Sequence, residues 1–329
     1  MSSKRFVRNS ELTLWRECRL KWFLSYYLGF LSDNINKHFW LGGLIHLALS
    51  EWYLNRVSDP VHFFWWLGSE SIEQERGFEV SVDGEQFEIG YLDELEKYLI
   101  IGQAMLEGYM EWAAKENSDF DVIDSELSYF VDQNEYTMVA KLDLLTENSE
   151  GIRVEDFKTA ADFRAERTVD QDMQFRRYPW MVAQAHPEWA GEVVGSKWVA
   201  LRKIEPSGRS KPPYFKRALV DLSWNELHEV GVELAAEVTA MLSVEYDLQS
   251  GQLDSRQVIY PSPSVDCSWK CNFFNNGICR TWRAGAGEGQ IQEFGKLYGS
   301  FGNDHYAEYR EEFKGSVPIN IVSRREGLA

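Results

Sequence analysis

The sequence predicts an α/β (α+β) fold in which a core sheet is flanked by helices, with further helical elements towards the N-terminus. Up to about residue 117 the apolar residues recur at helical spacing. Between residues 121 and 158 the pattern changes to short segments rich in β-branched and aromatic residues, separated by turn formers. Helical and strand-like segments then alternate as far as Gly251. This order is typical of helices that surround one sheet.

Two helical regions precede the predicted sheet. A first helix is expected to begin at a cap formed by Ser10 and to continue through Cys18. A second helix, over residues 41–54, carries His46, and helical spacing continues over residues 60–117. The histidine therefore lies on a helix that comes before the sheet in the chain.

The sheet itself is predicted from three consecutive antiparallel strands, which are followed by a helix and two more strands. The expected strands are 121–130, 136–145, 152–158, 193–204 and 214–222. The expected helix after the third strand is 168–185, with Pro179 inside it. A capping box from Ser223 to Glu226 opens a long helix that ends near Gly251.

Composition limits the class of protein. A length of 329 residues suggests about two domains, or one domain enlarged by insertions. With 34 Lys and Arg against 52 Asp and Glu, the net charge is −18, which excludes a cationic nucleic-acid coat but not a local basic groove. There is no secretory signal and no apolar run of about 18 residues. We therefore expect a cytoplasmic protein without a membrane partner.

Acidic and basic side chains meet on the predicted strands. A strand's period of two places Asp156 and Lys158 on the same face, and the preceding strand ends at Asp143. Glu126 lies on the strand before that. Adjacent carboxylates repel each other unless a cation neutralises them, and their hard oxygen atoms suit Mg²⁺ or Mn²⁺. A lone Asp-x-Lys triplet is common by chance, so the interpretation depends on its neighbours.

Four short motifs follow one another in an order that resembles a known family. They are Gly42-Gly-Leu-Ile-His46, Ala140-Lys-Leu-Asp143, Asp156-Phe-Lys158-Thr159 and Gln174-Phe-Arg-Arg-Tyr178. Over roughly residues 10–279 this order resembles the RecB-like branch of the PD-(D/E)xK nuclease superfamily, in which Ala140 is usually glycine. The resemblance implies a restriction-endonuclease-like core sheet.

The resemblance also implies roles for individual residues. The implied metal ligands are His46, Asp143, Asp156 and the backbone carbonyl of Phe157. The other catalytic candidates are Lys158, Gln174, Tyr178 and Glu126. Lys158 would orient the attacking water, and Gln174 and Tyr178 would position the strand or brace the lysine. Glu126 would join the same site.

The four cysteines have an uneven distribution, with Cys18 alone and the other three within residues 267–279. A reducing compartment argues against two disulfides and leaves a metal, a cluster or free thiols. An iron–sulfur subgroup of these nucleases, which includes CRISPR-associated adaptation exonucleases and the AddB nuclease domain, takes one cysteine before the core and three after it. By this resemblance Cys18, Cys267, Cys271 and Cys279 hold a [4Fe–4S] cluster, with Zn²⁺ as the alternative.

The domain organisation is expected to follow the same resemblance. A RecB-like nuclease domain would span residues 1–285, with a helical part at about 30–117 inserted before the core sheet. The cluster region would join Cys18 to residues 267–279, and residues 286–329 would form a linker and a C-terminal tail.

The resulting functional hypothesis is a Mg²⁺- or Mn²⁺-dependent deoxyribonuclease, an exonuclease in preference to an endonuclease, that acts in phage or bacterial DNA recombination, replication or processing. Its partners would be DNA ends or single strands and proteins of recombination or replication. The residues expected to contact DNA are Arg164, Arg167, Arg176 and Arg177. More distant candidates are Lys197, Arg202, Lys203, Arg209, Lys211, Lys216 and Arg217. The alternatives are a non-catalytic DNA-binding or assembly subunit and a zinc-stabilised interaction protein.

Overall fold

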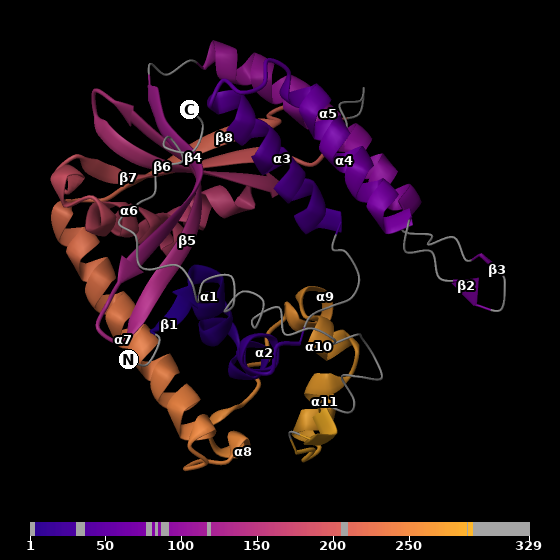
Figure 1. The fold of residues 1–329 in the computed structure, drawn as a ribbon, viewed down its shortest axis with the longest axis vertical. Helices are drawn as coiled ribbons and strands as arrows, with labels where there is room; N and C mark the ends of the chain where they lie inside the picture. Colours follow the sequence, from indigo (N-terminus) through magenta and orange to yellow (C-terminus); the bar gives the residue numbers. More distant parts are fainter. Residues whose placement is uncertain are drawn as a thin grey trace. The chain divides into compact units, whose positions relative to one another are not determined.

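The computed structural model describes residues 4–30, 37–76, 81–82, 85–86, 92–116, 120–204, 210–287 and 289–291 (Figure 1). The chain forms two compact units, which we describe separately. The sheet unit contains residues 35–129 and 141–228, and the cysteine unit contains residues 1–34, 130–140 and 229–329. A central mixed sheet flanked by helices confirms the predicted fold class.

The sheet has six strands, five of which the sequence predicts. They are β1 (Arg5–Arg8), β4 (Asp121–Asp132), β5 (Tyr136–Asn148), β6 (Gly151–Ala160), β7 (Val193–Arg202) and β8 (Phe215–Asp221). The order is β1-β5-β6-β7-β8, and β4 also pairs with β5. β5 runs antiparallel to β6 and β7 antiparallel to β8, whereas β6 and β7 are parallel. The short, arginine-rich β1 gives no strand signal in the sequence, and it pairs parallel to β5.

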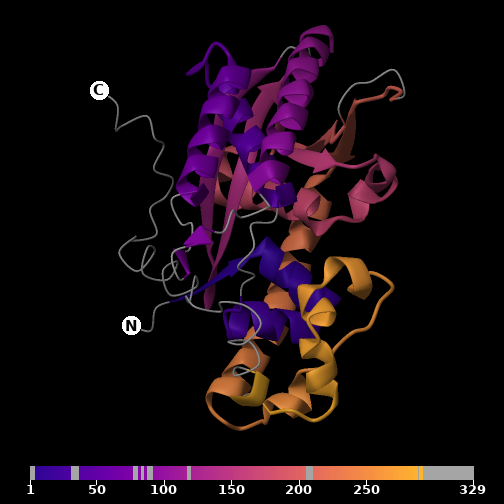
Figure 2. The same cartoon turned by 90° about the vertical axis from the view of Figure 1, so that its right-hand side faces the viewer.

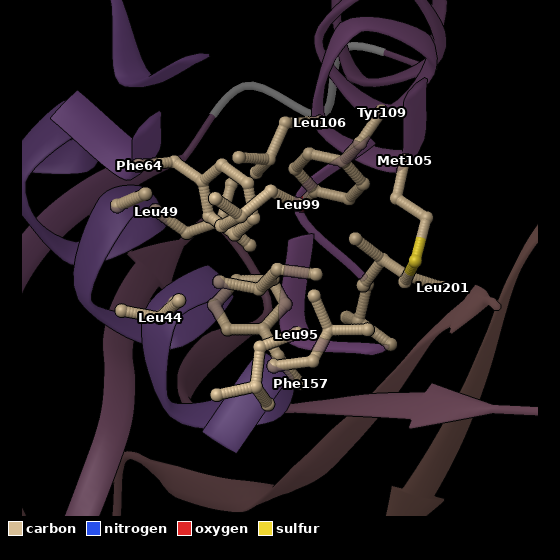
Figure 3. Packing of buried hydrophobic residues seen from close by; sticks show 14 of the residues in the cluster. Leu44, Leu49, Phe64, Leu95, Leu99, Met105, Leu106, Tyr109, Phe157 and Leu201 are labelled. Carbon is tan, nitrogen blue, oxygen red and sulfur yellow. The ribbon is translucent and has the colours of Figure 1, made fainter. Parts of the chain in front are cut away.

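Three helices of the sheet unit pack together on one side of the sheet (Figure 2). They are α3 (Lys37–Tyr53), α4 (Pro60–Arg76) and α5 (Leu92–Lys115), and two short strands, β2 (Ser81–Val82) and β3 (Glu85–Gln86), lie between α4 and α5 in the chain. Figure 3 shows Phe64, Leu99 and Leu106 of the helices close to Phe157 and Leu201 of the strands. This apolar contact fixes α3, and therefore His46, against β6.

The helix after β6 begins later than predicted. Residues Arg164–Gln171 form a 3-10 helix, η2, and the α-helix α6 covers Met173–Ala185. The side chain of Asp172 accepts a hydrogen bond from the backbone N–H of Gln174 at 2.9 Å and so caps α6. The cap therefore sets the start of α6 five residues after the predicted position, and a short 3-10 helix, η3 (Pro187–Trp189), follows α6.

The N-terminal helix of the cysteine unit is not continuous, contrary to the prediction. α1 (Asn9–Glu17) and α2 (Arg19–Trp22) are separated by Cys18, whose backbone is extended at φ −162° and ψ 113°, and Arg8 takes the cap position predicted for Ser10. A π-helix, η1 (Phe23–Tyr27), follows α2. At the break, the N–H of Leu20 donates to the carbonyl of Tyr260 at 3.1 Å. A partner far away in sequence thus replaces a helical hydrogen bond.

The C-terminal part contains one long helix and four short ones: α7 (Trp224–Gln249), α8 (Ser255–Val258), α9 (Cys267–Lys270), α10 (Asn272–Asn275) and α11 (Ile278–Arg283). The predicted capping box before α7 is confirmed, because Ser223 N–H donates to Glu226 Oε2 at 2.8 Å and Glu226 N–H donates to Ser223 Oγ at 3.3 Å. The predicted tail lies largely outside the described residues, although Ile291 is buried. Within the described part of the chain, no helix is long and apolar enough to cross a membrane.

Candidate active site

The site begins where two strands of the sheet unit separate. The antiparallel ladder of β5 and β6 ends at the pair Leu144–Glu155, and Asp143 and Asp156 lie one residue beyond it. There the backbone N–H of Phe157 donates to Asp143 Oδ2 at 2.8 Å. A carboxylate thus takes a hydrogen bond from β6 beyond the end of the ladder, while β6 continues to pair with β7 as far as Ala160. The gap between the strands therefore lies on the side of β6 that faces β5.

Asp143 is paired with His46 from α3. The distance from His46 Nδ1 to Asp143 Oδ1 is 3.2 Å. Burial acts to raise the pKa of Asp143, but the charge and hydrogen bond of His46 and the charge of Lys158 together lower it below its ordinary value. Burial acts to lower the pKa of His46, but the charge and hydrogen bond of Asp143 and the charge of Asp156 raise it. These opposite shifts favour a charged His46–Asp143 pair.

Glu126 reaches the same place through an unusual backbone. Its φ is +55°, a left-handed conformation that is rare for a non-glycine residue inside a strand. The neighbouring Ser125 Oγ donates to the backbone carbonyl of Asp143 at 2.6 Å and anchors this part of β4 to β5. One ligand atom each from His46, Glu126 and Asp143 lie within 4.8 Å of one another. The Glu126 carboxylate also forms an ion pair with Lys141 of β5.

Asp156, Lys158 and Gln174 form a closed ring of polar contacts. Lys158 Nζ lies 2.6 Å from Asp156 Oδ2 and donates to Gln174 Oε1 at 3.1 Å. Gln174 Nε2 in turn donates to Asp156 Oδ1 at 2.6 Å. The side chains of Asp156 and Lys158 therefore lie together, as their strand spacing predicts. Tyr178, one turn after Gln174 on α6, is hydrogen-bonded to the same glutamine.

The charges in this ring are strongly coupled. Burial raises the pKa of Asp156 to about 6, with the Lys158 charge opposing the shift and the Asp143 charge adding to it. Burial acts to lower the pKa of Lys158, but the charges of Asp156 and Asp143 raise it above its ordinary value. The pKa of Tyr178 is raised by burial and by the two aspartates. Lys158 is thus kept cationic, and Tyr178 is kept neutral.

The donor chemistry fits a divalent cation. His46, Glu126 and Asp143 offer one imidazole nitrogen and carboxylate oxygens, a set that suits Mn²⁺ or Mg²⁺. Asp156 is not in this group of three, because its oxygens face Lys158 and Gln174. Metal ligation by Asp156 and by the backbone carbonyl of Phe157 stays a prediction.

The predicted DNA-contacting residues have unequal exposure. Arg164 and Arg167 on η2 are exposed, and Arg164 lies 2.7 Å from Asp162. Arg177 is fully buried at 0% exposure, and its contact with DNA stays a prediction. Lys197 is also buried, and its ammonium pairs with Glu155. Cationic side chains in a sequence do not by themselves reveal which of them are buried in ion pairs.

The sequence signals missed three polar contributors to the site: Ser125, Lys141 and Asp172. Asp172 could have been found as a helix cap before Gln174, because Asp is a preferred cap residue. Ser125 and Lys141 act through contacts between β4 and β5 that depend on the irregular backbone at Glu126. No local pattern indicates such contacts.

The cysteine unit brings its four thiols close enough to interact. Burial raises the pKa of Cys279, and the charges of Cys18, Cys271 and Cys267 act in the same direction. No disulfide joins any of the four. Backbone N–H groups point at two of the sulfur atoms, from Ser262 to Cys18 Sγ at 3.4 Å and from Ser264 to Cys267 Sγ at 3.3 Å. All four side chains are partly buried.

Of the comparisons with known proteins, one with a family model covers most of the chain. The family model described as the PD-(D/E)XK nuclease superfamily matches residues 9–273. The search of curated proteins found no match. Among solved structures, the chain is similar to a protein named "Putative exonuclease" from Eubacterium rectale, with a TM-score of 0.45 and 11% sequence identity over 84% of this chain and 87% of the other. At this score and identity the structural likeness carries no argument about function.

Proposed function

The chain belongs to the PD-(D/E)XK nuclease superfamily, and from this premise we propose that it is a Mg²⁺- or Mn²⁺-dependent deoxyribonuclease that acts as an exonuclease. The observation that carries the proposal is the convergence of His46, Glu126 and Asp143 beside the Asp156–Lys158 pair. Nucleases of this superfamily use divalent metals, and this group of side chains can supply the ligands.

Different residues of the chain are proposed to have different roles in phosphodiester hydrolysis. His46, Glu126 and Asp143 would hold the metal, which supplies Lewis-acid polarisation of the phosphate and lowers the pKa of a bound water. Asp156 is proposed as a further ligand. Lys158 is held cationic by Asp156 and offers its ammonium to the attacking water and to the charge that develops on the phosphate. Gln174 fixes the position of that ammonium.

The preference for DNA and for exonucleolytic cleavage rests on the resemblance to RecB-like nucleases. The exposed Arg164 and Arg167 on η2, with the half-buried Arg176 on α6, support a phosphate-binding surface beside the site. On the same resemblance we place the activity in phage or bacterial DNA recombination, replication or processing, with DNA ends or single strands as the substrate.

We also propose that the four cysteines bind a [4Fe–4S] cluster. A tetrahedral zinc site with Zn–S distances of about 2.3 Å would place its sulfur atoms roughly 3.8 Å apart. The charges of Cys18, Cys271 and Cys267 all act on the Cys279 thiol, which supports one shared centre, and the choice of a cluster over zinc rests on the resemblance.

Cleavage of end-labelled DNA tests the proposed activity. The purified protein should degrade DNA in Mg²⁺ or Mn²⁺, stop in excess EDTA and recover when the metal is restored, because hard oxygen ligands bind these ions reversibly. Asp143→Asn should abolish cleavage and Mn²⁺ binding together. Asp162→Asn, outside the group of metal ligands, is the matched control and should stay active. Cleavage that persists in excess chelator would contradict the proposal.

A further inference from the structure

Each carboxylate proposed as a metal ligand has a basic partner from the chain. The two aspartates are paired with His46 and Lys158, which belong to the proposed catalytic set. The third carboxylate, that of Glu126, is paired with Lys141. Lys141 is neither a proposed metal ligand nor a proposed catalytic residue, so those roles do not explain why it lies at the site.

Lys141 approaches the site from the solvent side. It lies two residues before Asp143 on β5, so the two side chains share one face of the strand. Its side chain is 56% exposed, whereas that of its partner Glu126 is 12% exposed. The ammonium group thus sits at the mouth of the proposed metal site on a long and flexible stem.

Of the two partners, Lys141 is the one that can move. Glu126 is held by the left-handed backbone of β4 and by the bond from Ser125 to the Asp143 carbonyl. Its carboxylate is also one of the three proposed metal ligands. A divalent cation and the Lys141 ammonium therefore compete for the same carboxylate, and their charges repel each other at this short range.

We propose that Lys141 is an exchangeable counter-ion. It neutralises Glu126 in the metal-free protein, gives up this carboxylate to the divalent cation, and then binds a backbone phosphate of the nucleic-acid strand. The proposal rests on the proposed nuclease function and makes Lys141 a positioning residue that couples the two binding events. A phosphate offers the released ammonium a new partner, so metal and strand should each raise the affinity for the other.

Direct measurement of Mn²⁺ binding tests the proposal without relying on catalysis. Free Mn²⁺ is followed by its paramagnetic resonance signal, with the full chain alone and with a phosphorothioate single-stranded oligonucleotide that resists hydrolysis. Lys141→Met should bind Mn²⁺ about three- to tenfold more tightly than the wild type without the oligonucleotide, because one nearby positive charge is gone. It should also lose the gain in Mn²⁺ affinity that the oligonucleotide gives the wild type.

Two further variants separate the charge of Lys141 from general effects. Lys37→Met removes a partly exposed lysine that is paired with Glu94 outside the site and should behave as the wild type. Lys141→Arg keeps the charge and should keep the wild-type Mn²⁺ affinity. If Lys141→Met binds Mn²⁺ no more tightly than the wild type, or keeps the full oligonucleotide effect, the inference is overturned while the nuclease proposal stands. A wild-type protein that binds no Mn²⁺ would overturn both.

Discussion

Gln174 is the residue on which the position of the catalytic lysine depends. Its carbonyl oxygen accepts from Lys158 and its amide nitrogen donates to Asp156, so both ends of one amide group are used. A carboxylate at this position would lose the donor and add a negative charge beside Asp156. An apolar side chain would leave the Lys158 ammonium held by Asp156 alone, with no second contact to fix its direction.

Replacing Gln174 should therefore reduce the rate of cleavage with little effect on metal binding. We expect Gln174→Leu to lower kcat by about 10- to 100-fold, the size of effect that follows from a small misplacement of a catalytic group. Mn²⁺ affinity should change much less than kcat, because Gln174 contacts none of His46, Glu126 and Asp143 and, of the proposed ligand side chains, touches only Asp156, the proposed further ligand. Cleavage kinetics and a Mn²⁺ titration provide the check, with the exposed Gln171→Leu as the control. Wild-type kcat in Gln174→Leu would contradict the assigned role.

Regular alternation explains which site residues could be predicted from sequence. Asp156 and Lys158 lie two residues apart on a regular strand, so their shared face follows from the strand period alone. Glu126 was expected at the site, but the left-handed backbone by which it approaches the site from β4 is not revealed by composition or spacing. Its partner Lys141 is hidden for the same reason, and the burial of Arg177 follows from tertiary packing.

At the scale of elements, α3 contains two glycines whose packing differs from that of a glycine on α5. A Cβ atom added at Gly43 would meet nothing within 4 Å, and one at Gly42 would meet only Thr159 Oγ1, at 3.5 Å. A Cβ atom added at Gly102 would lie 2.2 Å from the Phe64 ring. Glycine inside a helix costs roughly 0.5–1 kcal/mol relative to alanine. Of these three glycines, only Gly102 is required by the close approach of helices.

This contrast predicts opposite effects of one substitution. Gly43→Ala should raise the free energy of unfolding by about 0.5–1 kcal/mol, because the helix gains stability and no contact is strained. Gly102→Ala should lower it by roughly 1–3 kcal/mol, because the new methyl group displaces Phe64 in the core. Urea unfolding of the two variants measures both changes. A Gly43→Ala protein less stable than the wild type would contradict the open space beside Gly43.

The break between α1 and α2 could not be predicted from the local sequence. Residues 10–22 have helical spacing throughout, and nothing within that segment predicts an extended Cys18. The N–H of Leu20 finds its acceptor in Tyr260, 240 positions later in the chain. Helix caps such as Ser223 with Glu226 were predictable because both partners lie within one turn. A helix end that depends on a remote carbonyl is decided only by the tertiary fold.

At the scale of the whole molecule, the cysteine unit is assembled from both ends of the chain. β1 pairs with the first residues of β5, and Arg5 forms an ion pair with Glu245 of α7 at 3.2 Å. Within the same unit, the charge of Cys18 acts to raise the pKa of the Cys271 and Cys279 thiols. A cluster bound here would link positions 18 and 267, which are 267 − 18 = 249 residues apart. It would close a very long loop.

Loss of one cysteine ligand should therefore cost both iron and stability. We expect anaerobically purified wild-type protein to be brown and to contain iron, and Cys18→Ser to lose the iron and to unfold at a lower temperature. A covalent link across so long a loop stabilises by about 5 kcal/mol in the chain-entropy model, and a bound cluster acts in the same way. Iron analysis and thermal unfolding measure the two effects.

Iron removal supplies the matched control for the cysteine substitution. If the cluster acts by linking the two ends of the chain, wild-type protein stripped of iron should unfold at the same temperature as Cys18→Ser, and stripping should change the variant no further. A Cys18→Ser protein with full iron content would contradict the four-ligand site. If the anaerobic protein is colourless and contains one zinc per chain, the bound metal is zinc and not an iron–sulfur cluster. Cys18→Ser should then still lose metal and stability together, because either centre joins the same distant segments.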